Sequence, residues 1–143
     1  EFRSVEPIQL AEGLNVICAH ATVRCTACMT MELLARETLD ESFKDAVDAG
    51  KIVFRGINYE RPEVSEFCSE YKVATASIVL VLVQDGKAVA GVNLANEAWK
   101  LHTDASAFKG MLKEQIESII QGKVLEIDGS PDEIIFDDDE LFF

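Results

Sequence analysis

The sequence lacks long apolar runs and is poor in basic residues. No stretch of the 143 residues approaches the roughly 18 apolar residues that a membrane-spanning helix needs, and no signal-peptide pattern is present. Lys and Arg number 13 against 26 Asp and Glu, so the formal net charge is −13. This balance argues against nucleic acid and anionic lipid as partners, and leaves small molecules and other proteins.

Other kinds of site are missing as well. The sequence contains no glycine-rich phosphate loop, and its carboxylates, Glu12 and Glu97 among them, show no paired spacing typical of acid–base hydrolysis. Four cysteines are too few for a protein that depends on a framework of disulfides. Only Cys25 and Cys28 lie close together, so cysteine chemistry becomes the main question.

What is present is an ordinary apolar content of 48% and a regular order of elements. Apolar and β-branched runs predict strands over residues 14–21, 51–60, 77–83 and 87–93, the last two joined at the turn dipeptide Asp85-Gly86. Helical spacing predicts helices over residues 26–39, 40–50 and 62–72, and a last one from Thr103 or Asp104 to Gly122 with Ile120 facing inward. Trp99 and His102 fall in a stretch predicted to be irregular. The order predicts an α/β fold, a mixed four-stranded sheet with helices on both faces.

The two ends differ from this body. We expect residues 1–13 to be a lead-in, residues 14–122 the folded domain, and residues 123–143 an acidic apolar tail with eight acidic residues and one basic residue. The tail is either a solvated terminus or a segment whose apolar side chains dock on the body or on a partner. A short helix can begin at Ser130 by its capping pattern. Because the chain begins at Glu1 rather than Met, we also expect that an upstream signal or anchor was removed.

The stretch "ATVRCTACMTMELLARETLD", residues 21–40, carries the cysteine pair between a predicted strand and a predicted helix. There Cys25 lies at the helix N-terminus, where free backbone N–H groups and the helix dipole stabilise a thiolate. Cys28 lies one turn further in and is less exposed. The pattern predicts Cys25 as the nucleophile and Cys28 as the resolving thiol, with Arg24 lowering the pKa of Cys25.

Three alternatives remain for these residues. A structural zinc site needs four ligands, and only His20, His102, Cys18 and Cys68 are left to join the pair, scattered along the chain. A vicinal dithiol can also bind a soft metal ion or a trivalent arsenical. The third alternative is a non-catalytic adaptor that assembles through its tail. We expect Cys18 and Cys68 to be core residues; if they pair, they form a structural staple and favour an oxidising compartment.

The order β-CxxC-α-β-α-β-β-α resembles the thioredoxin fold over roughly residues 14–121. The stretches "HATVRCTACMTMELLARE", "INYERPEVSEFCSEYKV", "VLVQDGK" and "NLANEAWKL" look most like small bacterial thioredoxin-like proteins described as subunits of a nitrophenyl compound nitroreductase and associated with arsenical detoxification. The resemblance implies thiol–disulfide exchange with a partner protein, a membrane thiol reductant or a second thioredoxin-like subunit, and no organic cofactor. Such relatives often carry an anchor or export signal, which favours an extracytoplasmic, membrane-tethered or exported protein.

The sequence departs from thioredoxins around the pair. Arg24 stands where they have Trp, Thr26-Ala27 where they have Gly-Pro, and Ser77 where they have a cis-proline, so we expect the peptide before Ser77 to be trans. The buried acid of thioredoxins falls near Ala19, and the neighbouring His20 is the candidate to handle the proton of the inner thiol, unless it is a structural residue. By resemblance, the residues expected to contact substrate are Thr26, Ala27, Ala76, Ser77 and Trp99.

Overall fold

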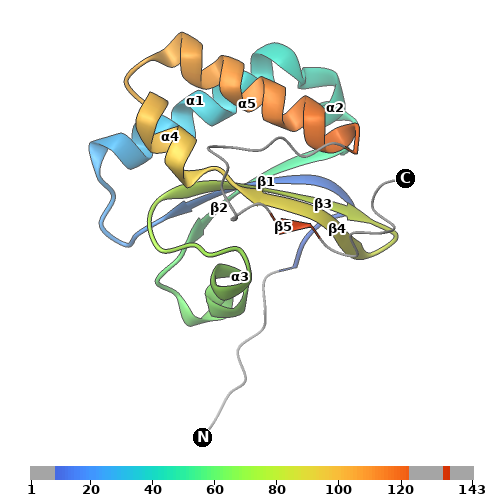
Figure 1. Ribbon diagram of the computed structural model, residues 1–143, viewed down its shortest axis with the longest axis horizontal. Helices are drawn as coiled ribbons and strands as arrows, with labels where there is room; N and C mark the ends of the chain where they lie inside the picture. Colours follow the sequence, from blue (N-terminus) through green and yellow to red (C-terminus); the bar gives the residue numbers. More distant parts are fainter. Residues whose placement is uncertain (1–8, 123–133, 136–143) are drawn as a thin grey trace, which may run out of the picture.

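The computed structural model describes residues 9–122 and 134–135. Within them the chain forms one sheet flanked by helices on both sides (Figure 1). The elements are β1 (Gly13–His20), α1 (Thr26–Ser42), α2 (Lys44–Asp48), β2 (Ile52–Asn58), the 3-10 turn η1 (Pro62–Val64), α3 (Ser65–Glu70), β3 (Ser77–Gln84), β4 (Lys87–Asn93), α4 (Ala95–Leu101), α5 (Ala105–Ile120) and β5 (Ile134–Ile135).

The sheet has the strand order β2-β1-β3-β4-β5. β1 and β2 run parallel, with α1 and α2 between them in the sequence, whereas β3 is antiparallel to β1 and β4 is antiparallel to β3. A parallel pair needs such a crossover, and an antiparallel pair needs only a tight turn. Strands β1 to β4 are the predicted mixed four-stranded sheet, and with the helices on both faces they make a thioredoxin-like fold.

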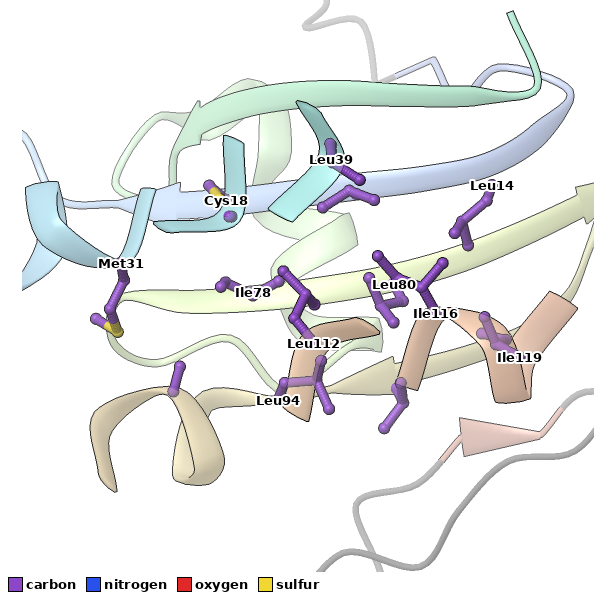
Figure 2. Packing of buried hydrophobic residues seen from close by; sticks show 14 of the residues in the cluster. Leu14, Cys18, Met31, Leu39, Ile78, Leu80, Leu94, Leu112, Ile116 and Ile119 are labelled. Carbon is purple, nitrogen blue, oxygen red and sulfur yellow. The ribbon is translucent and has the colours of Figure 1, made fainter. Parts of the chain in front are cut away.

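Alternate residues of the central strands feed two separate cores, as the two-residue period of a strand requires. Leu14, Val16 and Cys18 of β1 pack under α1, α4 and α5, whereas Ile17 and Ala19 face α3 on the other side of the sheet. Figure 2 shows the larger core, where Leu112 and Ile116 of α5 lie against Leu80 of β3. Both faces of β1 and β3 are therefore buried, which explains their nearly unbroken apolar sequences.

The β3–β4 hairpin turns where the sequence predicted. Asp85 and Gly86 have φ values of 55° and 76°, the positive pair that a two-residue hairpin turn of this kind needs. The carboxylate of Glu12 accepts hydrogen bonds from the backbone N–H groups of Asp85 and Gly86, at 2.7 and 3.1 Å. The lead-in before β1 thus holds the far end of the hairpin.

Several predicted boundaries are wrong. α1 continues through Asp40 to Ser42, so Asp40 lies inside a helix and does not begin a new one. The stretch with Trp99 is α4 rather than irregular; the side chain of Asn93 accepts the N–H of Ala95 at 2.8 Å and supports its first turn. Ile120 is 47% exposed, because it lies at the end of α5 away from the inner side that Ile116 and Ile119 occupy.

β5 adds a short strand that the sequence analysis did not predict. Ile134 and Ile135 pair with Gly91 and Ala90 of β4 in antiparallel orientation. The remainder of residues 123–143, including the helix start predicted at Ser130, lies outside the described residues. In the described part of the chain no helix has the length and apolarity to cross a membrane.

Candidate active site at the start of α1

Cys25 is the N-cap residue of α1. Its backbone is extended, with φ −96° and ψ 166°, and its Sγ accepts the backbone N–H of Cys28 at 3.3 Å. An N-cap side chain usually offers an oxygen to these free N–H groups, and here a sulfur takes that place. The thiol of Cys25 is exposed, so a bulky partner can reach it.

Cys28 lies one helical turn further along and is buried. Both cysteines are free thiols, and their Sγ atoms are 2.8 Å apart within hydrogen-bond distance. The hydrogen bond from the Cys28 thiol, followed by that from the Cys28 backbone N–H, lowers the pKa of Cys25. Burial, followed by the hydrogen bond to Cys25, raises the pKa of Cys28. The outer sulfur is therefore the one that ionises first.

A small cavity lies behind Cys28, with a volume of about 10 Å³, close to what one water molecule needs. It brings together five predicted site residues, His20, Arg24, Cys28, Ala76 and Ser77, from three separate parts of the chain. Its lining consists of Cys18, Ala19, His20, Arg24, Cys28, Met31, Glu32, Ala76, Ser77 and Ile78. The end of β1, the start of α1 and the start of β3 thus meet beside the inner cysteine.

Glu32 is the cavity residue that the sequence analysis missed. It follows Cys28 by four residues and precedes Arg36 by four, so all three lie along one side of α1. Its carboxylate accepts hydrogen bonds from the guanidinium of Arg24 and, at 3.3 Å, from that of Arg36. Burial alone would raise the pKa of Glu32, but the two arginines outweigh it and lower the pKa. The helical spacing was the signal that could have identified it.

The pairing of Arg24 with Glu32 bears on its predicted role. The guanidinium is turned to the carboxylate, and the lower pKa of Cys25 arises from hydrogen bonds made by Cys28 and by backbone groups. The charge of Arg24 does act on Cys28, whose pKa it lowers against the effect of burial. An effect of Arg24 on the reactivity of the pair remains a prediction.

His20 ends β1 and borders the cavity together with Cys28. Its Nδ1 lies 3.0 Å from the carbonyl oxygen of Ala21, so a proton on Nδ1 can be donated to that oxygen. In a neutral ring with its proton on Nδ1, Nε2 is the nitrogen that can accept a proton. The role of His20 in moving the proton of Cys28 therefore remains a prediction with a compatible tautomer.

The segment before β3 has the expected backbone. No cis peptide bond occurs in residues 9–122 and 134–135, so the peptide before Ser77 is trans, as predicted. Ser77 is buried, and its hydroxyl donates to the carbonyl of Thr75 at 2.7 Å. The neighbouring Ala76 accepts a hydrogen bond from Nε1 of Trp99 at 2.9 Å. Trp99 does not line the cavity but holds the segment that does.

The remaining residues expected to contact substrate lie at the mouth of the site. Thr26, in the first turn of α1, is exposed, and Ala27 is half-buried. Tyr59, just after β2, was not predicted. Burial and the charge of Glu60 raise its pKa, and the charges of Cys28 and Cys25 raise it further.

Cys18 and Cys68 lie on opposite sides of the sheet, in the larger and the smaller core respectively. Both are free, and burial raises the pKa of each. The structure thus has them as packing residues, as expected, rather than as a staple. Across residues 9–122 and 134–135, no group of three or more His, Cys, Asp or Glu side chains is arranged to hold a metal ion.

Comparison with known proteins gives structural likenesses only. No protein-family model and no curated protein matches the chain. The zinc-bound form of human ERp44 is similar at a TM-score of 0.49 and 11% identity, over 75% of this chain and 28% of that one. Thioredoxin from Trypanosoma brucei brucei is similar at 0.44 and 20%, over 82% and 92% of the two chains, and mitochondrial thioredoxin 3 from Saccharomyces cerevisiae at 0.38 and 20%, over 62% and 74%. The chain therefore spans about a quarter of ERp44 and most of the thioredoxins. At these levels the comparisons carry no argument about activity, and the fold is called thioredoxin-like on the strand order and helix placement described above.

Proposed function

We propose that the protein is a thiol–disulfide oxidoreductase in which Cys25 is the nucleophile and Cys28 the resolving thiol. The observation that carries this proposal is the pair of contacts at Cys25 Sγ: the 2.8 Å hydrogen bond between the two sulfurs, which Cys28 donates once Cys25 is ionised, and the hydrogen bond from the backbone N–H of Cys28. Both bonds favour the thiolate over the thiol of an exposed cysteine. Cys28 is also the residue that would complete the exchange.

The reaction is a two-step exchange of sulfur bonds. The Cys25 thiolate attacks one sulfur of a partner disulfide, the partner S–S bond breaks, and the released partner thiolate takes up a proton. Cys28 then loses its proton and attacks Cys25 Sγ, which forms the Cys25–Cys28 disulfide and releases the second partner sulfur as a thiol. Two electrons pass from the protein dithiol to the partner. Starting from the Cys25–Cys28 disulfide, the same steps in reverse oxidise a partner dithiol.

The surroundings of Cys28 support its role in the second step. A buried thiol whose pKa is raised stays protonated until the mixed disulfide forms, which prevents it from competing with Cys25 for the partner. Loss of its proton must then be assisted. His20, whose free ring nitrogen can accept a proton, and the charge of Arg24 are the groups beside it that favour this ionisation.

The finer features of the proposal come from the sequence. The partner is a protein disulfide or dithiol, with a membrane thiol reductant as one form of it, and no organic cofactor is required by the exchange. The resemblance to nitroreductase-subunit proteins, and the extracytoplasmic location that it favours, remain predictions. The direction of electron flow depends on the reduction potential of the pair relative to its partner.

Trapping of the mixed disulfide tests the assignment of roles. A disulfide-linked peptide incubated with C28S should leave one peptide half attached to Cys25, detected by mass spectrometry, because no resolving thiol remains. The C25S variant should accumulate no adduct, and wild type should release both halves. If C28S forms no adduct while the wild-type dithiol binds phenylarsine oxide one to one, the protein is a dithiol-binding module and the oxidoreductase proposal is wrong.

A further inference from the structure

Exposed apolar side chains gather next to Cys25. In the part of the chain that the structure describes, the exposed large apolar residues are Val23, Met29, Leu33 and Ile120, with exposed fractions of 84, 49, 54 and 47%. All but Ile120 lie within eight residues of Cys25. Surface apolar residues scattered singly need no explanation, whereas a cluster beside a reactive group marks a contact surface.

Met29 and Leu33 line an open groove along α1. The groove has a volume of about 390 Å³ and is lined by Arg24, Met29, Glu32, Leu33 and Arg36; we call it the α1 groove. It is shallow and open to solvent, unlike the enclosed clefts that hold small ligands. One of its lining residues is Arg24, which directly precedes Cys25 in the chain.

The α1 groove carries positive charge in a chain whose net charge is −13. Arg24 and Arg36 both donate to the single carboxylate of Glu32, which leaves one positive charge unbalanced in this group of three. Arg36 is further held by its guanidinium lying 4.7 Å from the centre of the Phe54 ring, and its side chain is 60% exposed. A fixed guanidinium with N–H groups to spare is a good receptor for a carboxylate.

The distance between Cys25 and Arg36 determines how far apart a partner peptide must carry its reactive cysteine and a carboxylate that binds Arg36. Arg36 follows Cys25 by 11 positions, which is roughly 16 Å along a helix at 1.5 Å per residue. An extended peptide covers that distance in about five residues at 3.3 Å each. Large apolar side chains in between would meet Leu33 and Met29.

We propose that the α1 groove binds the partner polypeptide of the exchange reaction, and that this partner carries large apolar side chains and a carboxylate within about five residues of its reactive cysteine. This inference rests on the proposed oxidoreductase function. Charge complementarity selects the occupant, because the unbalanced guanidinium charge at Arg24, Glu32 and Arg36 favours a carboxylate and disfavours a lysine. The apolar side chains of Met29 and Leu33 supply the remaining contact.

The test uses three disulfide-linked peptides that share a leucine-containing flank and differ at one position five residues from the cysteine, which is Asp, Asn or Lys. Second-order rate constants are measured for the single oxidation of the pre-reduced full chain by each peptide, which needs no added reductant, in about 0.15 M salt, where the screening length is about 8 Å and distant charges of the body contribute little. Hydroxyethyl disulfide, which has no flank, serves as the small substrate. We expect the Asp peptide to react about tenfold faster than the Lys peptide.

Substitutions at the groove are judged by the rate constant for the Asp peptide divided by that for the Lys peptide. A general change in activity alters both rate constants equally and leaves this ratio unchanged. R36Q should bring the ratio close to one, and R36E should invert it. K44Q removes an equal charge from exposed α2, where Lys44 pairs with Asp48, and should leave the ratio at its wild-type value. L33Q should slow the leucine-flanked Asp peptide more than an alanine-flanked Asp peptide.

The outcomes separate the two proposals. If the reduced wild type reacts with neither hydroxyethyl disulfide nor any peptide, and its disulfide form oxidises no peptide dithiol, the oxidoreductase function itself is wrong. If the wild type reacts with all of them and the rate constants of the three peptides agree within twofold, only the docking inference is overturned. The same holds if R36Q keeps the wild-type ratio of the Asp to the Lys rate constant. If the preference for Asp appears only after deletion of residues 136–143, the chain's own acidic tail occupies the groove and the partner assignment is overturned.

Discussion

The indole Nε1 of Trp99 donates a hydrogen bond of 2.9 Å to the carbonyl oxygen of Ala76, and this bond joins α4 to the segment beside Cys28. Trp99 is only half-buried, and its ring also meets that of His102 edge-on at 5.7 Å. The contact explains how a residue outside the cavity affects it. The backbone at Ala76 and Ser77 is held from α4 rather than by a proline.

W99F therefore tests the hydrogen bond with little change in packing. Loss of the bond leaves the Ala76 carbonyl without this partner, so we expect the free energy of unfolding to fall by about 1–2 kcal/mol, measured by urea denaturation. The exchange rate with a peptide disulfide should fall as well, since the segment beside Cys28 is less firmly held. If W99F changes neither the free energy of unfolding nor the exchange rate, the hydrogen bond from Trp99 does not stabilise the segment at Ala76.

The pH dependence of Cys25 alkylation tests the origin of its low pKa. Because the Cys28 thiol is the main cause of the lowering, the rate of alkylation by iodoacetamide should reach half its maximum below the pH of an ordinary cysteine. C28A removes that donor and should move the midpoint to higher pH. C28S retains an O–H donor and should stay nearer wild type. Identical midpoints in C28A and C28S would mean that the side-chain hydrogen bond is not the cause.

The four thiols should differ in reactivity in the order of their environments. Cys25 is exposed with a lowered pKa, Cys68 is half-buried with a raised one, and Cys18 and Cys28 are buried with raised values. With limiting reagent at neutral pH, mass spectrometry should find the label on Cys25 alone, and on Cys18 only after unfolding. Early labelling of Cys18 in the native protein would contradict its placement in the core.

Gly→Ala substitutions at two positions, one crowded in the sheet and one open in α5, should have opposite effects on stability. A Cβ at Gly91 would lie 2.6 Å from Cε1 of the buried Tyr71, so G91A should destabilise the protein by about 1–3 kcal/mol. A Cβ at Gly110, inside α5, meets nothing within 4 Å, so G110A should stabilise it by about 0.5–1 kcal/mol. Urea denaturation measures both, and equal effects of the two substitutions would refute this account of the sheet face at Gly91.

Much of the fold could be predicted because its signals are local. Alternation and β-branched runs identified β1 to β4, Asp85-Gly86 identified the hairpin, and the position of the CxxC identified the start of α1. The order of these elements then leaves few topologies. The predictions that failed concern a short helix and a helix end. α4 has only seven residues and was missed. Ile120 belongs to the last turn of α5, where helical periodicity no longer determines which side chains are buried.

The candidate site was predictable only in part because it is assembled across the sheet. The CxxC spacing is a local signal, and the resemblance added His20 and Ser77, which the structure places with Cys28 at one cavity. Glu32 was missed because a glutamate on an amphipathic helix is ordinarily a solvated residue. Its ion pairs with Arg24 and Arg36 place it in the site, and these pairs cannot be predicted from any single position in the sequence.

The most direct test of the central claim is a glutathione redox titration of the whole protein, with each cysteine followed by alkylation and mass spectrometry. We predict a reversible two-electron transition confined to Cys25 and Cys28, with Cys18 and Cys68 remaining as thiols throughout. The midpoint would also give the direction of electron flow, since about 30 mV changes the equilibrium constant tenfold for this couple. If Cys25 and Cys28 form no disulfide at any ratio of reduced to oxidised glutathione, they are not an exchange pair and the proposed function is wrong.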